Sequence, residues 1–412
     1  MFTSEEKSFL RGIAKELRHA AGDPANEEKR AFWRRHTALK AERPAIFVFP
    51  DGAWDELMPV SELRCSHPYA KRVEYELRTR LIRSQILPDD VPAEPTFFVE
   101  KVVHNTMWGI EPRRIQSGQN GGSWHHEPVI ETPADWSKLS MPRVEYDEQE
   151  TKERLECVGD LLSDVLDVSL TGIKQVDFHI LHYYCDFRGL ENMYMDLILE
   201  PEAVHSTIRF FTDGLKSMFL QYEEQNLLSM NNDGTFHYTG GIGYTDDLPN
   251  SPSFDPLHIR LCDMWGAAEA QEFSSVSPEM HEEFILQYER ELLELFGLNG
   301  YGCCDDLSKK LDGVLKIKNL RRVAVCPYAD IAEFTPRLKK DYMMTWKPQP
   351  SYLAHEELGE EEICKELHEG LAKAKGGVIE LVLRDTHTCR KQPGRFTRWI
   401  ELAREAIAEV WG

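Results

Sequence analysis

Apolar residues recur along the chain in two alternating patterns. From Ala45 onward, short apolar or β-branched runs alternate with longer stretches in which apolar residues return at helical spacing. This alternation is typical of a parallel sheet covered by helices. Strands are predicted at 45–49, 97–103, 176–182, 258–262, 298–303, 322–326, 341–346 and 378–384. Helices are predicted at 61–86, 150–167, 201–229, 278–297, 328–339, 357–374 and 394–411.

Strands that alternate with helices in this number predict an α/β fold, a closed (β/α)8 TIM barrel over residues 45–412. Residues 1–44 have a different pattern, which opens with the capping box Thr3-x-x-Glu6 and continues as two charged, amphipathic helices. We therefore expect an N-terminal helical extension that packs on the barrel or on a partner subunit, which leaves a homodimer open. Segments 105–149 and 230–257 do not fit the repeat and are predicted to be active-site loops.

Charge and composition narrow the class of protein. The 412 residues have a formal net charge of −22, which argues against nucleic acids and anionic membranes as partners, since both attract Lys and Arg clusters. No apolar run approaches the roughly 18 residues that span a bilayer, and the first residues lack the order of a signal peptide. Nine scattered cysteines suit a reducing compartment. We expect a cytoplasmic protein with a small-molecule substrate.

Two reactive segments follow predicted strands, where the active sites of (β/α)8 barrels lie. Tyr301-Gly302-Cys303-Cys304 offers adjacent thiols, which bind zinc or act as nucleophiles, or else are small buried side chains. Arg384-Asp385-Thr386-His387 adds a carboxylate and an imidazole, although Asp is also common as a helix cap. Closure of the barrel predicts that Cys303 or Cys304 shares a zinc-like ion with Asp385 or His387.

Further candidates follow other predicted strands or lie in the long loops. Asp51, Asp263 and Tyr301 are predicted to have catalytic polar roles, because each lies at or near the end of a predicted strand. The His-His pair in the first long loop either holds a ligand or is an ordinary polar loop. The predicted substrate-binding residues are Trp54, Trp108, Trp124, His125, His126, Trp265, Trp346 and Lys347. The indoles would give flat, apolar walls that suit an aromatic or corrin-like substrate.

The order of several motifs resembles the uroporphyrinogen decarboxylase superfamily over residues 45–412. The motifs that carry the resemblance are Asp263-Met264-Trp265-Gly266, Ser277-Pro278-Glu279, Tyr301-Gly302-Cys303-Cys304, Lys347-Pro348-Gln349-Pro350 and Gly376-Gly377-Val378-Ile379. The chain is most similar to a divergent branch in which YGCC and a final Lys/Arg-Asp-Thr-His recur. The superfamily also includes zinc methyltransferases that move methyl groups from corrinoid proteins to thiols.

The resemblance implies an altered metal site. In the methyltransferases a His-x-Cys sequence ends the matching strand, whereas here Tyr301 replaces the histidine and Cys303 keeps the thiol. Asp385 and His387 lie near the position of a second ligand cysteine. The decarboxylases use a group of arginines with an aspartate, and Asp51 has no arginine motif around it, so decarboxylation of uroporphyrinogen is disfavoured.

Three functions stay open. The leading one is a zinc-dependent methyltransferase that works with a cobalamin-bearing partner protein. The second is a metal-independent decarboxylase or lyase that acts on an acidic aromatic or tetrapyrrole compound. The third is a non-catalytic protein that binds a corrinoid or tetrapyrrole. The number of tightly bound zinc ions per chain separates the first function from the second, and a tinted complex without turnover would indicate the third.

Overall fold

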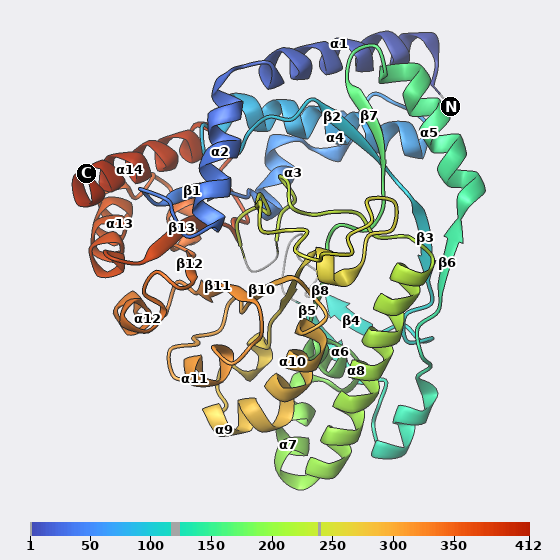
Figure 1. The fold of residues 1–412 in the computed structure, drawn as a ribbon, viewed down its shortest axis with the longest axis vertical. Coiled ribbons are helices and arrows are strands. Elements are labelled where there is room, and N and C mark those ends of the chain that lie inside the picture. The colour runs from blue at the N-terminus through green and yellow to red at the C-terminus, as the bar shows by residue number, and fades with distance from the viewer. Residues whose placement is uncertain (1, 117–123, 238–239) are drawn as a thin grey trace.

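A single parallel sheet organises the fold, which is of the mixed α/β type. The computed structural model describes residues 2–116, 124–237 and 240–412 (Figure 1). The sheet has seven strands in the order β1-β13-β12-β11-β10-β9-β8, and every neighbouring pair is parallel. Its strands are β1 (Ala45–Val48), β8 (Asp177–Phe178), β9 (Trp265–Ala268), β10 (Leu298–Tyr301), β11 (Leu320–Val325), β12 (Met343–Trp346) and β13 (Val378–Leu383).

Helices follow the strands, as the sequence pattern predicts. They are α1 (Ser4–Ala21), α2 (Ala25–Thr37), α3 (Trp54–Leu57), α4 (Pro68–Ile86), α5 (Glu148–Leu162), α6 (Ile180–Arg188), α7 (Leu190–Leu199), α8 (Pro201–Glu224), α9 (Pro278–His281), α10 (Gln287–Leu293), α11 (Leu311–Val314), α12 (Ile331–Leu338), α13 (Glu360–Ala374) and α14 (Gly394–Trp411). Buried β1 residues Ile46 and Val48 share a core cluster with Trp399 of α14. Within the described ranges, no helix has the length and apolarity that crossing a bilayer requires.

The predicted closed barrel is not confirmed, because β1 and β8 are opposite edges of the sheet. Polar groups replace a neighbouring strand along the outer edge of β1. The amide of Ile46 donates to Asp90 Oδ2 at 2.8 Å, and the amide of Val48 donates to Asp89 Oδ2 at 3.0 Å. Arg83 donates to the Val48 carbonyl at 2.6 Å. These side chains satisfy the groups that an edge strand would otherwise leave unpaired.

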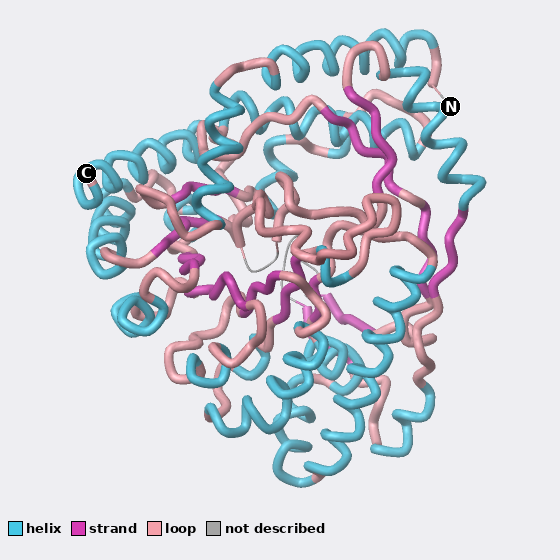
Figure 2. The backbone as a smooth tube through the Cα atoms, viewed as in Figure 1, coloured by secondary structure: helices cyan, strands magenta, loops and turns pink. Residues whose placement is uncertain are grey.

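The second predicted strand, 97–103, divides into two strands that leave the main sheet. β2 (Thr96–Glu100) pairs with β7 (Asp167–Thr171) in parallel, and β3 (Val102–Asn105) pairs with β6 (Val144–Asp147) antiparallel. In Figure 2 these strands form a magenta ribbon that runs along one side of the molecule, apart from β1. A further antiparallel pair, β4 (Arg113–Gln116) with β5 (Trp124–Glu127), lies inside the first predicted active-site loop.

Two other strand predictions need correction. Of the predicted strand 176–182, only Asp177–Phe178 is a strand, and α6 begins at Ile180. The predicted strand 258–262 is wrong. The strand begins later, as β9 at Trp265, and its four residues are small or aromatic. The small residues in β9 have a packing reason: a Cβ on Gly266 would lie 2.5 Å from the Phe296 ring. Close packing therefore favours residues that carry little strand signal in the sequence.

A buried polar layer lies halfway along the strands, on the face that α2 covers. Arg322 of β11 and Glu380 of β13 form an ion pair at 2.9 Å, and Thr345 of β12 donates to Glu380 at 2.6 Å. His36 of α2 lies 3.6 Å from the same carboxylate. We call Arg322, Thr345, Glu380 and His36 the mid-strand layer. It ties the first helices to the sheet, and the division at residue 44 stays a prediction.

Candidate functional site

The reactive side chains meet where β10, β12 and β13 end. The Sγ atoms of Cys303 and Cys304 lie 3.4 Å apart. Lys347 donates from Nζ to Cys303 Sγ at 3.0 Å and to the Cys303 carbonyl, also at 3.0 Å. Cys304 Sγ lies 4.0 Å from Asp385 Oδ2. We call Cys303, Cys304, Lys347 and Asp385 the strand-end site. The structure thus brings together the thiols and the carboxylate that the sequence predicts to be neighbours.

The backbone at the strand-end site has unusual dihedral angles. Gly302 has a φ of +89°, and a Cβ there would lie 2.5 Å from the side chain of Leu307. Asp51 and Asp385 have φ values of 47° and 59°, in the left-handed region that non-glycine residues rarely adopt. The Asp385 amide donates to Asp51 Oδ2 at 2.5 Å, which holds the ends of β1 and β13 together. Such backbone strain is concentrated at functional sites.

The two thiols differ in exposure and in acidity. Cys303 is buried, whereas Cys304 is exposed. The hydrogen bond from Cys303 lowers the pKa of Cys304, and the Lys347 charge lowers it further, although partial burial opposes both. The same hydrogen bond, together with burial, raises the pKa of Cys303. Cys304 is therefore the more acidic thiol of the pair and the one that is exposed to solvent.

A charged pair beside the thiols links the first and last strands. Arg384 lies 3.6 Å from Asp51 Oδ1 and 3.4 Å from Asp385 Oδ1. Burial raises the pKa of Asp51, while Arg384 and the Asp385 amide oppose that rise. The exposed His387 ring lies over Gly52, with Nδ1 3.5 Å from where a Cβ would be. His387 therefore lies beside the segment that follows β1, next to Asp51.

The donors fit a zinc ion only in part. Two ligands of one zinc ion are about 4 Å apart, which matches the pair Cys304 and Asp385. Lys347, however, already donates to Cys303, and a catalytic zinc takes three protein ligands. Among the described residues, three ligand atoms within 4.8 Å of one another occur at His104, Asp147 and Glu150, away from this site. The predicted zinc site is therefore incomplete as placed.

A half-buried histidine pairs with a buried carboxylate at the ends of β8 and β9. Glu269 follows β9, and its Oε1 lies 2.6 Å from Nδ1 of His179, which follows β8. The negative charge of Glu269 raises the pKa of both thiols of the strand-end site. Sequence reasoning missed His179, because the predicted strand ran through it to residue 182. A strand that ends at Phe178 would have placed His179 among the strand-end candidates.

Two predicted catalytic residues face other parts of the fold. The buried Tyr301 hydroxyl donates to Glu289 of α10 at 2.6 Å and lies 3.0 Å from His281 Nε2, so it points into the helix layer. Asp263 precedes β9 instead of ending a strand, and its carboxylate accepts from the Arg260 amide at 3.1 Å. The strand-end position expected for Asp263 is therefore wrong, since Asp263 lies before the start of β9, at the opposite end of the strands from the thiols.

Most of the described predicted indoles pack in the core. Trp108 contacts the rings of Tyr183 and Phe211, and Trp265 donates to a backbone carbonyl at 3.1 Å. Trp346 packs on α13, where a Cβ on Gly370 would lie 2.3 Å from its ring. These three side chains are buried, and none of them lines the cavity that Trp54 lines.

The remaining substrate-binding predictions lie in three places. Trp54 is half-buried and lines a cavity beside β1. His125 is exposed on β5, and Lys347 belongs to the strand-end site. The side chains of Trp124 and His126 lie outside the described part of the chain. Of the three described residues, Lys347 is the one that lies at the thiols.

Comparisons with known proteins give one named match. No family model matches the chain, and no curated protein sequence matches it. Among solved structures the chain is similar to a methyltransferase from Methanosarcina mazei, with 9% sequence identity over 92% of this chain and 98% of that one, at a TM-score of 0.48. Similarity at this level leaves the function to be argued from the strand-end site itself.

Proposed function

We propose that the chain is an enzyme of the methyltransferase type, with its chemistry at the strand-end site. The observation that carries the proposal is the exposed Cys304 thiol, which is paired at 3.4 Å with a Cys303 held by Lys347. The sequence motifs that resemble the superfamily with thiol-directed methyltransferases support the same assignment. Thiolates are good nucleophiles, and a neighbouring cation favours the thiolate at neutral pH.

The proposed step places the nucleophile at Cys304. Its sulfur forms a bond to the methyl carbon while the bond between that carbon and the methyl carrier breaks, and the carrier keeps the electron pair. The thiol proton leaves to solvent before the attack. Lys347 keeps a positive charge beside the Cys303 sulfur. Asp385 lies 4.0 Å from the Cys304 sulfur.

The methyl carrier in this proposal is a corrinoid on a partner protein, as the sequence resemblance implies. A bound zinc ion would lower the pKa of its thiol ligands and position a substrate thiol. Cys304 and Asp385 are the residues that would hold it, with a third donor still required. Metal analysis separates the two forms of the proposal. About one zinc per chain that is lost in Cys304→Ser would assign the ion to this site, and transfer by metal-free protein would assign the reaction to the thiolate alone.

The test is single-turnover methyl transfer from methylcobalamin under anaerobic conditions. The cobalamin spectrum reports loss of the methyl group, and mass spectrometry locates it on the protein. Wild type and Cys364→Ser should react, since Cys364 lies on α13, away from the site. Cys304→Ser should not. Equal demethylation in all three proteins would overturn the proposal, and a coloured complex without demethylation would favour the non-catalytic binding function.

A second candidate, decarboxylation of an acidic aromatic compound, is favoured by Asp51 and Arg384. Arg384 would hold the substrate carboxylate, and burial raises the pKa of Asp51, which suits it as a proton donor. The carbon–carboxylate bond breaks, carbon dioxide leaves, and the electron pair left on carbon takes the Asp51 proton. Release of carbon dioxide from an aromatic acid by Cys304→Ser, but not by Asp51→Asn, would select this function.

A further inference from the structure

A large cavity lies beside the open edge of β1, and none of the strand-end site residues lines it. Its volume is about 1190 Å³. Its walls come from the junction of α1 and α2, from α4, from residues 87–94 and from the loop near residue 236. A cavity of this size takes a ligand as large as a typical cofactor. Because a strand does not cover this edge, the fold leaves room for such a ligand.

One wall of the cavity is a stack of aromatic rings. The Phe236 ring stacks on Phe49 with centroids 4.9 Å apart and planes 9° apart, and it stacks on Phe47 at 5.5 Å and 28°. Trp54 and Tyr75 add two further rings to the lining. Flat aromatic walls of this kind favour a flat aromatic guest, since offset stacking adds to the gain from burial.

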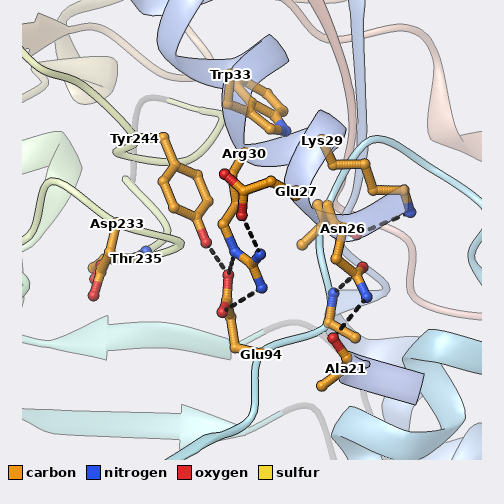
Figure 3. A network of polar contacts seen from close by, with 12 residues as sticks. Ala21, Asn26, Glu27, Lys29, Arg30, Trp33, Glu94, Asp233, Thr235 and Tyr244 are labelled. Carbon is orange, nitrogen blue, oxygen red and sulfur yellow. Dashed lines mark hydrogen bonds and ion pairs between the residues drawn. The ribbon is translucent and has the colours of Figure 1, made fainter. Parts of the chain in front are cut away.

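The cavity lining also carries a lysine without a direct carboxylate contact. Lys29 of α2 donates from Nζ to the Val91 carbonyl at 3.2 Å (Figure 3), and it makes no ion pair among the described residues. Glu94, a carboxylate in the lining, is already occupied: Arg30 donates to both its oxygens at 2.9 and 3.0 Å, and Tyr244 donates to it as well. Burial lowers the pKa of Lys29, and the charges of Asp89 and Asp90 oppose that fall only in part.

We infer that this cavity binds an aromatic acid, a flat aromatic molecule with one anionic group. The aromatic body lies against Phe47, Phe49 and Phe236, and the anionic group pairs with Lys29. An anion there gives the ammonium a direct charged partner, which the described residues do not supply within ion-pair distance, in surroundings that strengthen the pair. The inference does not depend on the function proposed for the strand-end site.

Two fluorescent probes that share an aromatic skeleton test the inference. Anilinonaphthalene sulfonate carries the anionic group, and phenylnaphthylamine lacks it. The wild-type chain should bind one sulfonate probe per molecule, at least about tenfold more tightly than the neutral probe, as one charge-assisted pair provides. Equal affinity for the two probes would overturn the role of charge.

Variants locate the site. Lys29→Met should weaken sulfonate binding to the level of the neutral probe, and Lys29→Arg should retain it. Thr79→Trp places a large ring in the cavity lining and should abolish binding of both probes, whereas Gln85→Trp, an exposed position on the same helix, should not. If Thr79→Trp binds like wild type while its thermal unfolding shows a folded protein, the cavity is not the site.

Discussion

The same strands place charged residues in two regions, halfway along the strands and just past their ends, and the two regions differ in burial and pairing. In the mid-strand layer Arg322 and Glu380 are fully buried and paired at 2.9 Å, with Thr345 completing the contacts of the carboxylate. At the strand-end site the Cys304 thiol is exposed, and its contact with Asp385 is 4.0 Å long. β12 and β13 each contribute to both regions.

The difference shows that position along a strand decides what a polar residue does. A charge halfway along a strand has neighbours on every side, so it must be paired or the fold is destabilised. A charge just past the strand end has solvent on one side, so its contacts are left incomplete. Incomplete contacts are what a substrate can use.

The largest expected effect is the loss of Glu380. Glu380→Ala leaves the buried Arg322 without its carboxylate partner, which should lower the free energy of unfolding by about 3–5 kcal/mol. Asp385→Asn, just past the end of the same strand, removes a charge but keeps a residue that tolerates a positive φ, so it should change the free energy of unfolding by less than about 0.5 kcal/mol. Denaturant unfolding of both variants checks this. Similar losses for the two would remove the distinction between the regions.

The pH dependence of stability should follow the mid-strand layer. Although burial alone would raise the pKa of Glu380, Arg322, His36 and Thr345 lower it from 4.5 to about 2. A lowered pKa gives stability that is fully present above pH 4.5 and is lost as the pH falls toward 2. The stability difference between wild type and Glu380→Gln should therefore shrink by up to about 3 kcal/mol over that range. A constant difference would contradict the lowered pKa.

Removing the ammonium at the strand ends should affect reactivity more than stability. Lys347→Met takes away the cation beside the sulfurs, so alkylation of Cys304 by iodoacetamide near pH 7 should slow about tenfold. Lys347→Arg should keep most of the rate. Peptide mass spectrometry with timed quenching measures both. An unchanged rate in Lys347→Met would show that the lysine does not support the thiolate.

The smallest effect concerns the division of labour within the thiol pair. Cys303→Ala removes the thiol donor and with it the contact that lowers the pKa of Cys304. The pH midpoint of Cys304 alkylation should then rise toward the ordinary value of 9.0. Cys389→Ala serves as a control, because Cys389 is buried and hydrogen-bonded to Glu56. A midpoint that falls in Cys303→Ala would reverse the assigned roles.

Sequence patterns predicted the strands and helices whose apolar pattern is strong. The apolar runs that became β11 and β13 were placed within a few residues, as were α8 and α14. β9 was misplaced because its small residues are required by contact with Phe296, and a contact has no sequence period. The thiol–carboxylate neighbours were predicted from closure of the barrel, but in the open sheet they meet because β10 and β13 end on the same side of it. The hydrogen bond from Lys347 to Cys303 depends on the reach of the lysine side chain.

The open edge of the sheet was not predictable from strand counting. It depends on Asp89 and Asp90, two adjacent acidic residues that look like an ordinary polar turn in the sequence. Their carboxylates reach backbone amides of β1, and Arg83 reaches one of its carbonyls. Eight strands were predicted, but the main sheet has seven, because residues 97–103 form β2 and β3 outside it, and β1 keeps an edge without a neighbouring strand.

The open edge of β1 has a geometric consequence. In a closed barrel, strand number, stagger and diameter fix one another. Here the rings of Phe47, Phe49 and Phe236 stack beside β1, and side chains instead of a strand ladder contact its outer edge. The open sheet is therefore not subject to the relation that ties strand number to diameter in a closed barrel.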